Sequence, residues 1–203
     1  IMRATEILSN EHRVIERVLT CLQAISEEAK IKGQLDAHSA REAVEFFRTF
    51  ADRCHHGKEE VHLFPALEAQ GFPRHGGPTG VMLAEHDEGR TAVRKMEEQI
   101  VPAAVGDAAA VSRFVEHAQQ FINLLREHIY KEDHVLFQLA DRTLTETEQQ
   151  SLLAAFQNVE TEDMGAGAHE RLLGIADRLA ARYGVGPAVV TPPGAFHCCG
   201  HHC

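Results

Sequence analysis

The sequence has little positive charge. It contains 20 Lys and Arg against 30 Asp and Glu, for a formal net charge of −10, and it has no basic block. Proteins that bind DNA or RNA neutralise phosphates with clustered Lys and Arg, so a nucleic-acid partner is not expected. The chain also lacks an apolar run of about eighteen residues and a basic segment followed by an apolar one at its start. We therefore expect a cytoplasmic protein with no membrane partner.

Cysteine is scarce outside the end of the chain. Of five cysteines, Cys21 and Cys54 fall in helical patterns and the other three lie within the last six residues. This distribution excludes the spaced framework of a small disulfide-linked protein. Strand patterns are also missing, while 203 residues at 44% hydrophobic suffice for one sizeable core. We expect an all-α protein whose two internal cysteines are reduced.

Apolar residues recur at spacings of three and four in four long segments, which predicts four amphipathic helices. They cover about residues 5–30, 39–62, 79–101 and 107–139. Short connections favour an antiparallel up-down-up-down four-helix bundle over residues 1–144. Residues 145–185 form an extension with two further helices, at about 145–159 and 168–183, packed outside the bundle. Residues 186–203 form a Pro/Gly linker and a Cys/His-rich tail.

Local signals refine the second and fourth helices. Ser39 and Glu42 form a capping-box pattern at the start of the second helix, and Pro65 predicts a break or restart after it. The inner face of the second helix is expected to carry Val44, Phe47, Ala51, His55 and Glu59. The inner face of the fourth is expected to carry Phe121, Leu124, His128, Glu132, Val135 and Leu139.

A ten-residue pattern occurs twice, at residues 55–64 and 128–137. In each copy a His precedes a Glu by four residues, which places an imidazole and a carboxylate one turn apart on the same helix face. His12 and His86 lie on the inner faces of the first and third helices. Four His and two Glu from four helices suit a two-iron centre inside a bundle.

Two frames compete in the first copy, because His55 and His56 each have a Glu four residues later. Aligned with the second copy, His55 and Glu59 match His128 and Glu132, whereas His56 and Glu60 match Ile129 and Asp133. Only the first frame repeats both donor types. His56 or His62 remains the alternative ligand.

At these residues the chain resembles the hemerythrin-like (HHE cation-binding) family. The matching motifs are residues 11–16 around His12, residues 55–65, residues 76–78 leading into 85–90, and residues 128–137. The resemblance implies a bundle around a non-haem di-iron site bridged by two carboxylates and an oxo or hydroxo group. The implied ligands are His12, His55, Glu59, His86, His128 and Glu132.

One position departs from the oxygen-carrying members, which have a second His where this chain has Arg90. Four imidazoles leave about one open position on each iron, which suits reaction better than storage. The resemblance thus implies an oxidoreductase that binds and processes O2, peroxide or nitric oxide with an unidentified electron donor. The alternatives are a non-enzymatic O2 or nitric oxide sensor or carrier, or a protein of iron handling such as iron-centre repair.

Three further candidates stand outside this ligand set. Glu16, one turn after His12, could support the metal or pair with Arg13 on the surface. Tyr130 could donate a hydrogen bond near the site, although helical geometry turns it off the ligand face. The tail could bind Zn, Cu or Ni, act as a thiol relay, or be an inert terminus. Its candidate residues are His197, Cys198, Cys199, His201, His202 and Cys203.

Overall fold

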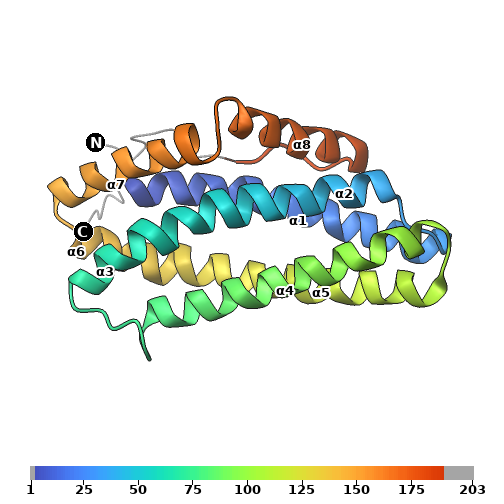
Figure 1. Ribbon diagram of the computed structural model, residues 1–203, viewed down its shortest axis with the longest axis horizontal. Helices are drawn as coiled ribbons and strands as arrows, with labels where there is room; N and C mark the ends of the chain where they lie inside the picture. Colours follow the sequence, from blue (N-terminus) through green and yellow to red (C-terminus); the bar gives the residue numbers. More distant parts are fainter. Residues whose placement is uncertain (1–2, 190–203) are drawn as a thin grey trace, which may run out of the picture.

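The computed structural model describes residues 3–189, and every regular element in that range is helical. The helices form four rods that lie side by side, with α7 and α8 along one face (Figure 1). The first rod is α1 (Ala4–Lys32), and the third is α4 (Pro78–Ala104). The second contains α2 (Ala37–Phe46), η1 (Phe47–His56), η2 (Glu59–Leu63) and α3 (Phe64–Ala69). The fourth contains α5 (Ala108–Lys131), η3 (Glu132–Leu136) and α6 (Phe137–Thr143).

The segment after the fourth rod packs against the outside of the rods. It consists of α7 (Glu146–Asn158), η4 (Val159–Asp163) and α8 (Ala168–Tyr183). Helix α8 contacts α1 and α2, and α7 contacts α1 and η2. A capping box formed by Thr145 and Glu148 starts α7, close to the predicted start of this helix at about residue 145. None of the helices in residues 3–189 is long and apolar enough to cross a membrane.

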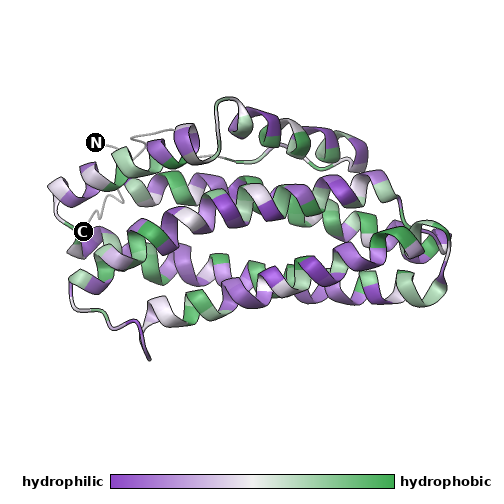
Figure 2. Ribbon diagram, in the orientation of Figure 1, coloured by the Kyte–Doolittle hydropathy of each residue, from purple (hydrophilic) through white to green (hydrophobic). Residues whose placement is uncertain are grey.

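The hydrophobic core is divided into two clusters by a layer of polar residues. Green and purple stripes along the rods in Figure 2 show the amphipathic pattern that builds both clusters. On each rod, buried His or Glu residues stand between a residue of one cluster and a residue of the other. The flanking pairs are Leu8 and Ile15 on the first rod, Leu63 and Ala51 on the second, Met82 and Val93 on the third, and Leu136 and Leu125 on the fourth. The polar layer is therefore enclosed by apolar packing on both sides.

The second rod begins earlier than predicted. Asp36 is its N-cap, and the Asp36 carboxylate accepts hydrogen bonds from the backbone N–H groups of His38 and Ser39. The predicted capping box at Ser39 and Glu42 is wrong because Asp36 already occupies the capping position. Pro65 lies in the first turn of α3, where its missing N–H costs little, so the helix restarts there.

Both ligand motifs contain π-helical turns that the sequence did not predict. Segment η2 begins at Glu59 and η3 begins at Glu132, the matching positions of the repeat. The extra residue in a π turn rotates the helix face that follows. Val135, predicted to face inward, is 60% exposed, and Leu136 and Phe137 are buried in its place. With these turns, Glu59 and Leu63 both lie on the inner face of the second rod, and Glu132 and Leu136 both lie on the inner face of the fourth.

Candidate metal centre

The structure gathers the six predicted ligands from all four rods into the polar layer. His12 comes from α1, His55 and Glu59 from the second rod, His86 from α4, and His128 and Glu132 from the fourth rod. Each side chain is at most 2% exposed. We call these six residues the central cluster. Its burial means that every polar atom in it needs a partner inside the protein.

Glu59 reaches two imidazoles with different oxygens. His55 Nε2 lies 3.5 Å from Glu59 Oε1, and His86 Nε2 lies 3.5 Å from Glu59 Oε2. Glu132 does the same from the opposite side: its Oε2 lies 3.2 Å from His12 Nε2 and its Oε1 lies 3.3 Å from His128 Nε2. The cluster thus has two halves, one at His12 and His55 and one at His86 and His128. Each carboxylate spans both.

A second layer of carboxylates orients the four imidazoles. Each ring places Nδ1 against an oxygen of an acidic residue from another rod. The pairs are His12 with Asp133 (2.9 Å), His55 with Glu11 (2.8 Å), His86 with Glu60 (2.7 Å) and His128 with Glu85 (2.8 Å). A carboxylate only accepts, so a neutral ring donates from Nδ1 and keeps the lone pair of Nε2 for the cluster.

Each of these outer carboxylates is held in turn by a cation. Arg13 binds Asp133, Lys58 binds Glu11, Arg90 binds Glu60 and Lys131 binds Glu85. Lys58 differs from the other three because its side chain is fully buried and binds a second carboxylate, Glu160 of η4, at 2.6 Å. The segment after the fourth rod therefore reaches the support of His55.

The central cluster leaves buried polar atoms unsatisfied. His12 Nε2, His55 Nε2 and all four oxygens of Glu59 and Glu132 have no hydrogen-bond partner. The Nε2 atoms of His86 and His128 lie 3.1 Å apart. Uncompensated burial of so many converging acceptors is strongly unfavourable, and divalent cations between them would satisfy the whole set. Two groups of residues place their donor atoms within 4.8 Å of one another. One is His12, His55, Glu59 and Glu132, and the other is Glu59, His86 and His128 together with the neighbouring His56. The residues thus fit a pair of metal ions.

The comparison with known families agrees with this geometry. The family model described as the hemerythrin HHE cation binding domain matches residues 3–140. The chain belongs to this hemerythrin family. Proteins of Mycobacterium bovis and of two Mycobacterium tuberculosis strains, named only as uncharacterized, are 24% identical to this chain over 170 residues. The match covers 84% of this chain but 66% of theirs, so the chain spans just under two thirds of those relatives. No solved structure matches it significantly.

Without bound metal, the charges of this hemerythrin-family cluster are strongly unequal. Burial and the nearby Glu132 charge raise the pKa of Glu59 well above its usual range. Burial also acts on Glu132, but the neighbouring imidazoles of His128 and His12 outweigh it and lower its pKa to about 2. Two carboxyls this close share a proton instead of both ionising. Burial opposes the charging of His12, yet the hydrogen bond between its Nδ1 and Asp133 and the negative charge of Glu132 raise its pKa to about 9.

The alternative ligand His56 lies at the edge of the cluster. It is 6% exposed, and a ring nitrogen comes within 4.8 Å of donor atoms of Glu59, His86 and His128. Its ring stacks on His86 at 3.8 Å with an angle of 12°. Lone pairs in the planes of two parallel rings do not converge on one ion, so we place His56 beside the cluster and not in it. His62 faces Phe156 outside the cluster.

The other predicted candidates lie elsewhere. Glu16 forms a surface ion pair with Arg13 at 3.0 Å, and so touches the outer end of the His12 support. Tyr130 is 63% exposed and stacks on His134, facing away from the cluster. The six tail residues fall in 190–203, outside the described residues.

Sequence reasoning missed the second layer. Lys58, Glu59 and Glu60 repeat as Lys131, Glu132 and Asp133, and a Glu precedes both His12 and His86. These matched neighbours were a usable signal. Which ring each one supports could not be read from it, because every pairing joins two rods that are distant in sequence.

The repeat supplies a matched test of the buried lysine. Replacing Lys58 by Met leaves the Glu11 and Glu160 carboxylates without the cation between them, and should lower the free energy of unfolding by about 3–5 kcal/mol. The matched variant Lys131→Met removes a cation whose side chain is 38% exposed, and should cost less than about 1 kcal/mol. Urea unfolding of the metal-free variants measures both. Equal losses would show that burial of Lys58 adds nothing.

Metal uptake should release protons. The pKa of about 9 keeps His12 protonated at pH 7 in the metal-free protein, and the raised pKa of Glu59 holds a further proton. Because a metal replaces these protons, its apparent affinity should rise as pH increases from 7 to about 9 and fall on acidification. Titration with Fe²⁺ or Zn²⁺ in weakly buffered solution containing a pH indicator measures the release. Asp133→Asn, which removes the anion beside His12, should reduce it. Release that does not vary with pH in this range would contradict the assignment.

Proposed function

We propose that this chain is a non-haem di-iron protein that binds and redox-processes a small oxidant. The observation that carries the proposal is the placement of Glu59 and Glu132, each with one oxygen toward either half of the central cluster. Carboxylates so placed would bridge two ions. His12 and His55 would hold one iron, and His86 and His128 the other.

The donor set favours iron over structural zinc. It consists of imidazole and carboxylate atoms, whereas zinc in a structural site favours thiolates or four closed positions. Cys54 is a buried thiol on the second rod, next to His55. Burial raises its pKa to about 12, so it stays protonated and is a poor metal ligand. Bound iron would supply one-electron redox chemistry and a position for a small ligand.

Arg90 supports processing over storage. Its guanidinium contacts Glu60 at 2.5 Å and Asp52 at 2.8 Å, so it holds the carboxylate that orients His86 and offers no donor atom to a metal. The centre then has four imidazoles for two ions and keeps positions open. The proposed fold is the antiparallel up-down-up-down bundle, which the alternating direction of the rods in Figure 1 supports.

The ligand set predicts about two irons per chain, as expected for this motif. Glu59→Ala or Glu132→Ala should release both ions, because each residue would bridge them. Glu45→Ala removes a glutamate of the second rod whose ion pair with Arg171 lies at the surface, and should leave the iron content unchanged. Elemental analysis of protein produced with ample iron is the measurement. Stoichiometric zinc without iron, or loss of iron in Glu45→Ala alone, would contradict the assignment.

The reduced protein should oxidise in air instead of forming a stable oxygen adduct, because no fifth imidazole completes either half. Anaerobic optical and Mössbauer spectra, taken before and after adding O2, hydrogen peroxide and nitric oxide, follow the iron state directly. Recovery of the reduced spectrum under vacuum would favour a carrier. Binding of nitric oxide without oxidation or turnover would favour a sensor.

A further inference from the structure

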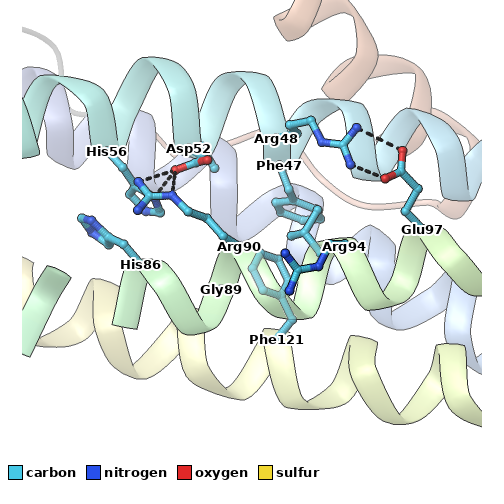
Figure 3. Close-up of a pocket in the computed structure, with 12 residues that line it drawn as sticks. Phe47, Arg48, Asp52, His56, His86, Gly89, Arg90, Arg94, Glu97 and Phe121 are labelled. Carbon is cyan, nitrogen blue, oxygen red and sulfur yellow. Dashed lines mark hydrogen bonds and ion pairs between the residues drawn. The ribbon is translucent and has the colours of Figure 1, made fainter. Parts of the chain in front are cut away.

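A pocket of about 300 Å³ opens between the second, third and fourth rods, beside the central cluster. Figure 3 shows its lining: Phe47 and His56 come from η1, His86, Gly89 and Arg90 from α4, and Phe121 from α5. This volume is many times what a single buried water molecule needs. It is therefore large enough to admit a small molecule from solvent.

The pocket ends at one half of the cluster. Its described lining includes His86, whose Nε2 faces Glu59 and His128, and His56, which stacks on His86. The same lining includes neither His12 nor His55. A molecule that enters here therefore arrives at the His86 half.

The other half is covered from outside. The His12 ring stacks on Phe137 at 5.3 Å with an angle of 8°. The support of His55 is covered by the buried Lys58 and its partner Glu160. The two halves thus have the same kinds of donor but unequal access.

The walls of the pocket select the kind of molecule that can enter. Phe47, Val93 and Phe121 form apolar sides. At the rim, Arg48 pairs with Glu97 and Arg90 pairs with Asp52, which neutralises two of the three arginines in the described lining; the third is Arg94. A charged or strongly hydrated molecule would lose hydrogen bonds to water along apolar walls, whereas a weakly hydrated one loses little.

We propose that this pocket is the entry route for small, uncharged, weakly hydrated ligands of the O2 and nitric oxide class, and that it delivers them to the metal at His86 and His128. The proposal rests on the proposed function for the metal centre itself. It assigns Gly89 as the residue that keeps the route open. A Cβ atom at Gly89 would meet only Phe121, at the ordinary contact distance of 3.5 Å, so a side chain there enters the pocket without moving the backbone.

The test is to block the pocket with Gly89→Leu. The control is Gly174→Leu, a second glycine within a helix, where a Cβ atom would meet only the flexible end of Arg178 at 3.4 Å. Stopped-flow mixing of the reduced iron protein with nitric oxide should show association slowed at least about tenfold in Gly89→Leu, equivalent to about 1.4 kcal/mol of added barrier. Gly174→Leu should match the wild type, and all three proteins should hold equal iron. Gly89→Ala, with its smaller side chain, should slow association less.

A measurement on the metal-free protein separates the route from the metal chemistry. Apolar protein cavities bind xenon, so xenon should shift the amide NMR signals of Gly89 and Phe121 in the wild type and not in Gly89→Leu. Unchanged nitric oxide association in Gly89→Leu, or no xenon effect in the wild type, would overturn the route while leaving the metal centre intact. If the wild-type iron protein binds neither O2 nor nitric oxide, the proposed function is overturned, and this inference with it.

Discussion

The structure depends on holding two carboxylates and four imidazoles together in one buried layer between the two hydrophobic clusters. Glu59 contacts His55 and His86, and Glu132 contacts His12 and His128. Apolar clusters enclose the two glutamates on both sides. Because these side chains are at most 2% exposed, protons or cations must balance their charge. In the metal-free protein a proton on Glu59 and another on His12 serve this purpose. Metal ions would bind the buried donor atoms that now lack partners, and the free energy of metal binding would then stabilise the folded protein.

The supporting groups make the four rods mutually dependent. Each imidazole on one rod is oriented by a carboxylate from another: Glu11 of α1 holds His55, and Glu85 of α4 holds His128. In return, Glu60 holds His86 and Asp133 holds His12. No rod carries both a ligand and the group that orients it. A shift of one rod would therefore displace its own ligand and also the imidazole that it orients on another rod. This mutual support holds the donor atoms in place without a metal.

The helices and the convergence of the six residues could be predicted because both depend on spacing along the chain. His12, Glu59 and Glu132 lie on apolar stripes, and the motif at residues 55–64 repeats. The π turns at Glu59 and Glu132 could not be predicted, because reading a helix face from spacing assumes the regular α-helical period. Nor could the Asp36 cap, because Ser39 and Glu42 offered an equally plausible local pattern three residues later. The pairing of Glu11 with His55 depends on the contact between α1 and η1, which local spacing does not encode.

The contact between Lys58 and Glu160 joins the region of the family match to the segment that follows it. The family match ends at residue 140, and a fragment ending there would contain every proposed iron ligand. It would lack Glu160 and also Phe156, whose ring lies 5.8 Å from the Lys58 ammonium. That ammonium would then face water instead of a second carboxylate, in the layer next to His55. The packed unit is thus larger than the region of the family match, and a protein shortened to that match would place the same ligands in a different chemical environment.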